Sequence, residues 1–184
     1  MNKGTLSIYV IDLSLDESFY QSALDIVGHE LKLKIVADAK HDRVLHFFSS
    51  TNRTENHLND HSELEYKHIC MPMTIAEKPT IKILRHLAKA NEEHSFDTPS
   101  NIQDVFVLAV DMVTKALGKF TRREVTIISE QFQTLTNSNM LQKAFNQAHG
   151  LEVQWKLISN QNVSNSLLQS ENIDKCTIAS WTRK

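Results

Sequence analysis

The sequence contains few of the residues that mark specialised classes of protein. Among its 184 residues, four are glycine, three are proline and two are cysteine. A loop that cradles phosphate needs clustered glycines so that backbone amides can approach the ligand, and the glycines here lie far apart. The two cysteines, Cys70 and Cys176, cannot form a disulfide framework for so long a chain. We therefore expect a reducing compartment.

Long apolar runs and a strong net charge are also missing. No apolar run approaches the ~20 residues that a membrane-spanning helix needs, and no charged-then-apolar leader is present. We therefore expect neither secretion nor insertion into a membrane. The formal net charge of -2 also argues against a free-standing nucleic-acid binder that depends on basic residues.

The clearest pattern in the sequence is a helix followed by a strand. Apolar side chains recur three and four residues apart over residues 102–117, which predicts a helix with little surface in water. Ser100 and Gln103 form a predicted capping box at its start, and Gly118 is expected as its C-terminal cap. The β-branched run 125–128 then predicts a strand buried on both faces.

The rest of the chain alternates strands and helices and predicts one α/β domain. Crossover helices between buried strands require an open, mostly parallel sheet with helices on both faces, a three-layer arrangement. Residues 65–71 are expected as an antiparallel edge strand that Pro72 ends. We expect the domain to span residues 1–159, with 160–184 as a polar tail or the last helix and strand of the same domain. The other predicted strands cover residues 6–11, 44–48, 153–157 and 177–181, and the other predicted helices begin at Ser18, Pro79 and Ser138.

Histidines and nucleophilic side chains are the residues that most often bind metals or carry out catalysis. His57 and His61 are four residues apart, a spacing that can bind Zn²⁺ on a helix, but the segment is not helical in pattern and no third ligand follows. We interpret both as surface histidines, and His46 as a hydrogen-bonded core residue. No serine or cysteine lies in a Gly-x-Ser-x-Gly elbow or beside a recognisable base, so we assign no catalytic residue and expect no enzyme activity. The basic cluster at residues 115–123 is interpreted as a solvated helix end.

Two stretches of the sequence resemble a known family. The order of elements, with Asp12 and Ser14 after the first strand, resembles the von Willebrand factor A domain. Residues 34–51 resemble the helix, turn and strand of the Ku proteins, in which a lysine and an acidic residue precede a strand ending in aromatic and small polar residues. Residues 104–129 resemble the helix, the Lys/Arg turn and the next strand of the larger Ku subunit. The resemblance covers about residues 5–158.

The Ku resemblance implies a nuclear, non-catalytic protein-interaction domain. Ku is a heterodimer that encircles DNA ends, supports non-homologous end joining and protects telomeres. In that family a β-barrel after the A domain holds the DNA, and the sequence stops before such a barrel could form. The resemblance therefore implies the smaller Ku subunit as heterodimer partner, contact with DNA ends only through the missing barrel, and recruitment of telomere or repair proteins by this domain, with no cofactor. Ku is sometimes assigned an ATP-dependent helicase activity, and no motif for it is present.

The A-domain resemblance also implies a position for a divalent metal. The family pattern is Asp-x-Ser-x-Ser after the first strand, a Thr before the central helix and an Asp after the next strand. The corresponding residues here are Asp12, Ser14, Asp16, Ser100 and Glu130, and three of the five depart from the pattern. Asp16 also suits the start of the first helix, where a carboxylate is favoured.

We therefore expect a degenerate polar cleft without a resident metal. One alternative is an A-type domain that binds its ligand through Mg²⁺ in another nuclear or cytoplasmic complex. Another is a hydrolase on a doubly wound fold, which would need a nucleophile that the sequence does not show.

Overall fold

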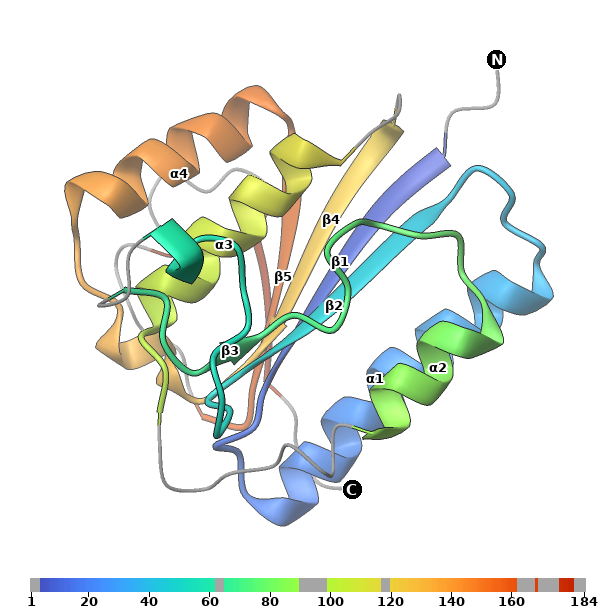
Figure 1. Cartoon of the computed structure of the whole chain (residues 1–184), viewed down its shortest axis with the longest axis horizontal. Helices are drawn as coiled ribbons and strands as arrows, with labels where there is room; N and C mark the ends of the chain where they lie inside the picture. Colours follow the sequence, from blue (N-terminus) through green and yellow to red (C-terminus); the bar gives the residue numbers. More distant parts are fainter. Residues whose placement is uncertain are drawn as a thin grey trace.

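The computed structural model describes residues 4–61, 65–89, 99–116, 120–161, 168 and 176–180. Its strands form one sheet in the order β3-β2-β1-β4-β5-β6, with helices on both faces (Figure 1). The strands are β1 (Gly4–Asp12), β2 (Arg43–Ser49), β3 (Ile69–Cys70), β4 (Phe120–Ile128), β5 (Val153–Ser159) and β6 (Cys176–Ser180). The helices are α1 (Glu17–Val36), α2 (Ile81–Ala88), α3 (Ile102–Lys115) and α4 (Asn139–Gly150), with short 3₁₀ turns η1 (Asn59–His61) and η3 (Gln131–Thr134).

The pairing of the strands confirms a mostly parallel sheet with one antiparallel edge. Strand β1 pairs in parallel with both β2 and β4, β4 pairs in parallel with β5, and β5 with β6. Among the strands that the structure describes, only the short β3 runs antiparallel, against β2. The predicted strand 125–128 is the buried part of β4, an interior strand that starts five residues earlier, at Phe120. The last predicted strand, 177–181, is confirmed as β6 up to Ser180.

Two hydrophobic cores lie on opposite faces of this sheet. Because side chains alternate along a strand, Leu6 and Ile8 of β1 point to the face covered by α3 and α4, while Tyr9 and Ile11 point to the face covered by α1 and α2 (Figure 1). Parallel strands need this double cover, since their apolar side chains emerge on both faces.

Aromatic rings join α3 to its neighbours in the first core. Phe106 of α3 is fully buried. Its ring lies edge-on to Phe145 of α4 at 5.5 Å between centroids, and 5.2 Å from Trp155 of β5. A third ring, Phe132 of η3, lies 6.5 Å away. These contacts confirm the predicted burial of the central helix and tie α3, α4, β5 and η3 together.

Two helix N-caps differ from the predicted ones by one or two positions, whereas Ser138 caps α4 as predicted. Asn101, not Ser100, caps α3, and its side chain accepts from the backbone amide of Gln103 at 3.0 Å. Asp16, not Ser18, caps α1, where its Oδ1 accepts from the Ser18 amide at 3.0 Å. The expected role of Asp16 at the helix start is thus confirmed. The predicted cap Gly118 lies outside the described residues.

The predicted edge strand is much shorter than expected. Only Ile69 and Cys70 pair with β2. Tyr66 and His68 have φ angles of 55° and 59°, a left-handed conformation that breaks the alternation of side chains. Residues 65–68 are therefore a bent loop, although their sequence has the alternation of a strand.

Helix α2 buries Ile83 and Leu87, whereas Ile81 is 61% exposed. This short helix lies beside α1 (Figure 1), so only a narrow strip of it needs to be apolar. Pro79 stands just before the N-cap residue Thr80 rather than within the first turn.

In the part of the chain that the structure describes, no helix is long and apolar enough to cross a membrane.

Candidate functional site

Polar side chains gather where three parallel strands end. The register sets Asp12 of β1 beside Ser49 of β2, and Ile11 beside Ile128 of β4, so the residues that follow these strands meet at one edge. Open α/β sheets bind ligands at this carboxyl edge. We call the group found there the top cluster, which consists of Asp12, Ser14, Ser50, Ser129 and Gln131.

Asp12 is the centre of the top cluster. It is 1% exposed. Its Oδ1 accepts hydrogen bonds from the Ser14 backbone amide at 3.0 Å and from Ser14 Oγ at 2.8 Å. Its Oδ2 accepts from Ser129 Oγ at 2.6 Å and from Gln131 Nε2 at 3.0 Å. A buried carboxylate is costly unless its oxygens are bonded, and here both oxygens have two donors each.

Gln131 reaches across the top cluster with its side-chain amide. Besides Asp12, its Nε2 lies 3.2 Å from Ser14 Oγ and 3.2 Å from Ser50 Oγ. The group facing Asp12 must be the NH₂ end, because a carboxylate oxygen can only accept. The backbone amide of Gln131 donates to Ser129 Oγ at 3.0 Å, which holds the start of η3 against the end of β4.

The five residues predicted for a metal site do not all come together. Asp12 and Ser14 are bonded partners, and Ser100 touches the cluster through its backbone amide, which donates to Ser50 Oγ at 3.1 Å. The carboxylate of Asp16 is used as the cap of α1, and its Oδ2 accepts from Asn160 at 3.4 Å.

Glu130 lies beside the cluster rather than within it. Burial raises the pKa of Glu130, the negative charges of Asp16 and Asp12 raise it further, and a hydrogen bond with Asn160 opposes these effects. The acidic groups are therefore close enough to repel one another.

The top cluster does not fit the divalent cation that the A-domain pattern implies. Such a cation needs oxygens with free lone pairs directed at one point. Here an N–H donor is directed at the oxygens of Asp12, Ser14 and Ser50. Over the residues that the structure describes, no three His, Cys, Asp or Glu side chains lie where they could hold a metal ion.

Sequence reasoning missed three members of the top cluster. Ser50 and Ser129 directly follow buried strands, and parallel strands end at a common edge, so their position could have been inferred. Gln131 belongs to η3, a turn within residues that looked like an ordinary loop. No motif in the sequence indicates that its side chain turns back to Asp12.

The histidines outside this edge have other roles. His57 bonds through Nε2 to Asp111 Oδ2 of α3, and the same carboxylate pairs with Lys115 Nζ at 2.9 Å. The side chain of His61 lies outside the described part of the structure.

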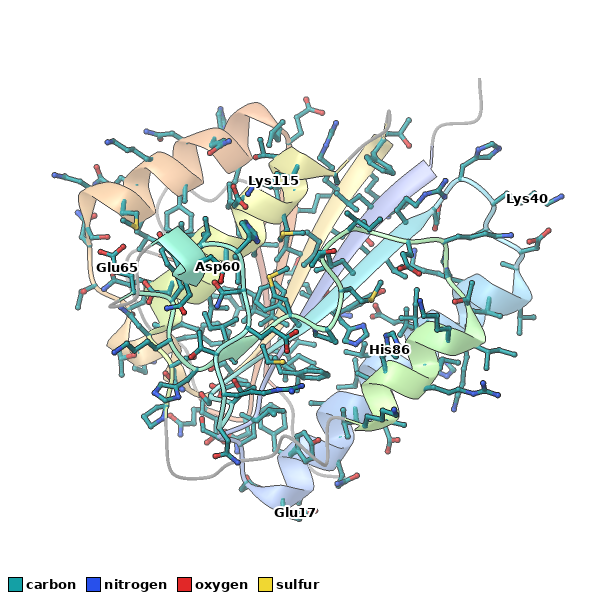
Figure 2. All side chains as sticks on the ribbon, in the orientation of Figure 1. Glu17, Lys40, Asp60, Glu65, His86 and Lys115 are labelled. Carbon is teal, nitrogen blue, oxygen red and sulfur yellow. The ribbon has the colours of Figure 1, made fainter. Side chains whose placement is uncertain are left out.

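The expectation of a hydrogen-bonded His46 is wrong. Neither ring nitrogen of this buried residue has a hydrogen-bond partner among the described residues, and its ring lies 6.4 Å from that of His86. Figure 2 shows His86 on α2. Burial, and then the nearby His86, lower the pKa of His46 to about 4.

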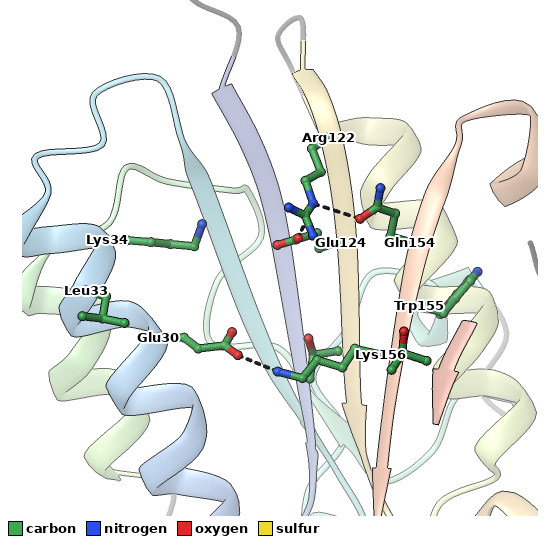
Figure 3. Close-up of a pocket in the computed structure, with 10 residues that line it drawn as sticks. Glu30, Leu33, Lys34, Arg122, Glu124, Gln154, Trp155 and Lys156 are labelled. Carbon is green, nitrogen blue, oxygen red and sulfur yellow. Dashed lines mark hydrogen bonds and ion pairs between the residues drawn. The ribbon is translucent and has the colours of Figure 1, made fainter. Parts of the chain in front are cut away.

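Of the basic cluster, Lys115 lies in the last turn of α3 as expected, but the two arginines do not belong to a helix end. Arg122 and Arg123 lie within β4, and Lys119 is outside the described residues. Arg122 borders a groove of about 660 Å³ on the α1 face of the sheet, where its Nε donates to Gln154 Oε1 at 2.9 Å (Figure 3). In the same groove Lys156 Nζ pairs with Glu30 Oε1 at 2.7 Å. Arg122 also pairs with Glu124, so both of these cations have a carboxylate partner within the groove.

The fold and the top edge together define the class of this chain. It has a von Willebrand factor A-like fold, with a mixed, mostly parallel sheet, one antiparallel edge pair and helices on both faces. It is similar to the solved N-terminal domain of TFIIH p34, with a TM-score of 0.60 and 15% sequence identity over 97% of this chain and 91% of that one. At this identity the likeness shows the fold alone. No protein-family model matches the sequence, and no curated protein matches it significantly.

Proposed function

We propose that this chain is the non-catalytic protein-interaction domain of a Ku-type DNA end-binding subunit. It would act in the nucleus, in non-homologous end joining and telomere maintenance, by recruiting repair or telomere proteins. The observation that carries the proposal is where the two Ku-like stretches lie. Residues 34–51 run from the end of α1 through β2 to the top cluster, and residues 104–129 comprise most of α3 and all of β4 and end at the same cluster.

The first stretch contains charged residues that join three elements. Lys34 Nζ at the end of α1 pairs with Asp42 Oδ2 at 3.0 Å, and Asp42 Oδ1 accepts from the Thr5 amide of β1 at 2.9 Å. Both charged side chains are less than one fifth exposed, at 19% and 18%. A lysine and an acidic residue before this strand thus have a structural reason to occur together, which supports the resemblance.

The proposed absence of catalysis agrees with the chemistry of the top cluster. The hydroxyls of Ser14 and Ser129 both donate to Asp12, and Ser50 accepts from Gln131. A serine nucleophile needs an adjacent base, usually a histidine. In the described ranges no hydroxyl of this cluster bonds to a histidine.

The proposal also assigns DNA binding to another part of the subunit. Three side chains of the basic cluster lie in the described part of the chain, and each has a partner within the domain. Arg122 pairs with Glu124, Arg123 Nη1 donates to the Leu151 carbonyl at 3.3 Å, and Lys115 pairs with Asp111. A surface that holds the DNA backbone needs many cations that can face phosphate, and a net charge of -2 does not favour one.

The test separates assembly, end binding and recruitment in the full-length protein. The tagged protein should co-purify from nuclei with the smaller Ku subunit and should retain linear DNA. Deletion of residues 1–159 should leave the heterodimer and its end binding in place and should remove the recruited repair or telomere proteins. Failure to recover the smaller subunit would refute the Ku assignment. If the deletion abolished end binding while the heterodimer persisted, the placement of DNA binding outside this domain would be wrong. If the repair or telomere proteins stayed bound after the deletion, the recruiting role would be wrong.

A further inference from the structure

We propose that the side-chain amide of Gln131 takes the place of the divalent cation at the top edge and locks the loops there without a metal. A metal ion in such a site does structural work, because it draws oxygens from several loops to one point. The nitrogen of Gln131 does the same. It contacts Asp12 at the end of β1, Ser14 just after that strand and Ser50 just after β2, and Gln131 itself follows β4.

The spacing of the cluster suits an N–H group rather than an ion. The three oxygens lie 3.0 to 3.2 Å from Gln131 Nε2. This is the normal length of an N–H···O hydrogen bond, whereas Mg²⁺ binds oxygen at about 2.0–2.1 Å. An NH₂ group has two protons for these three acceptors, so one proton is shared between two oxygens. The cluster as it is folded is therefore too wide for Mg²⁺.

The exchange of a cation for an amide changes the charge of the top edge. Hydrogen bonds satisfy Asp12 but do not cancel its charge, so this edge stays negative. Burial is the largest cause of the raised pKa of Glu130, and the negative charges of Asp16 and Asp12 raise it further. That contribution agrees with a negative top edge. A ligand carboxylate has no metal here to bind, and the loops are held in one arrangement whether or not Mg²⁺ is present.

The decisive variant is Gln131→Glu, which keeps the size of the side chain and replaces the amide nitrogen with a carboxylate oxygen. That oxygen would lie about as far from Asp12 Oδ2 as the present nitrogen, 3.0 Å, and two negative charges would face each other. We expect its melting temperature in a chelator to be lower than that of the wild type by about 5 °C. Millimolar Mn²⁺ or Mg²⁺ should restore most of that loss, because a cation can bind between two carboxylates.

Two further proteins keep the test interpretable. Gln133→Glu makes the same charge change on the exposed side of the same turn, and it should melt within about 1 °C of the wild type with or without metal. The wild type should show neither a shift in melting temperature nor heat of binding in a calorimetric titration with Mg²⁺ or Mn²⁺. This titration decides the question even if Gln131→Glu does not fold.

Three results would overturn the proposal. Metal binding by the wild type would mean that a cation displaces the amide. Full stability of Gln131→Glu in the chelator would mean that the amide holds nothing together. A destabilised Gln131→Glu that no metal rescues would mean that the amide does not stand at a cation position. None of these results depends on whether the chain is of Ku type.

Discussion

Acidification should destabilise this domain through one buried histidine. His46 has no hydrogen-bond partner among the described residues, and burial with the nearby His86 lowers its pKa from 6.5 to about 4. In the unfolded chain the imidazole takes up a proton near pH 6.5, but in the folded domain it does so only near pH 4. Between these values the unfolded state binds more protons, so the free energy of unfolding must fall as the pH falls.

The size of the effect follows from the two pKa values. A pKa shift of one unit corresponds to about 1.4 kcal/mol. The shift from 6.5 to about 4 therefore lowers the free energy of unfolding by about 3 kcal/mol once the pH is below both pKa values. Between pH 7 and pH 5 the loss should be about 2 kcal/mol. Other groups act in the opposite direction, because burial raises the pKa values of Asp104 and Glu130 and their protonation favours the folded state. The contribution of His46 must therefore be measured as a difference.

The assay is urea unfolding, followed by circular dichroism, of the wild type and His46→Leu between pH 7 and pH 5. Leucine has a similar volume and fits the core around this strand, in which every residue after Arg43 is buried. Between pH 7 and pH 5, the free energy of unfolding of the variant should rise by about 2 kcal/mol relative to that of the wild type. His29→Leu, on the exposed side of α1, is the control for loss of an imidazole outside the core. Parallel stability curves for the wild type and His46→Leu would refute the reasoning.

Three substitutions test the contacts that build the fold, each by the free energy of unfolding in urea. Phe106→Ala should cost about 3–5 kcal/mol, because it leaves a cavity where the ring contacts Phe145 of α4 and Trp155 of β5. A loss below about 1 kcal/mol would show that the surrounding core collapses into the cavity. Asp16→Ala should cost about 1 kcal/mol through the lost cap of α1, and Asp16→Ser should recover most of it. Asp42→Ala should cost about 2 kcal/mol because it leaves the Thr5 amide and Lys34 without their acceptor; a neutral result would mean that water replaces both bonds.

Much of the architecture could be predicted because its signals are local. The apolar spacing along α3 and the β-branched run in β4 follow directly from how much of each element is buried. The alternation of Val153, Trp155 and Leu157 likewise matches a strand with those residues buried and the residues between them half-buried. Burial sets the period of apolar residues, and the period can be read from the sequence.

Predictions failed where a side chain or a backbone angle depends on a distant neighbour. The alternating segment 65–71 contains two left-handed residues, Tyr66 and His68, and local propensity does not reveal them. In that loop the backbone amide of Tyr66 donates to Asp104 of α3 at 3.0 Å, and the amide of His68 donates to Thr54 Oγ1 at 2.9 Å. These long-range bonds hold the loop in a shape that the pattern of residues alone would not select.

By itself the sequence determined the class of fold, the order of most elements and the presence of oxygen-bearing residues such as Asp12 and Ser14 at the end of the first strand. Only the tertiary structure decided what those oxygens bind. Asp12 and Gln131 are 119 residues apart in the chain, and they meet because β1 and β4 are neighbours in the sheet. A hydrogen bond depends on distance and direction in space, and neither is encoded in residue type or local spacing.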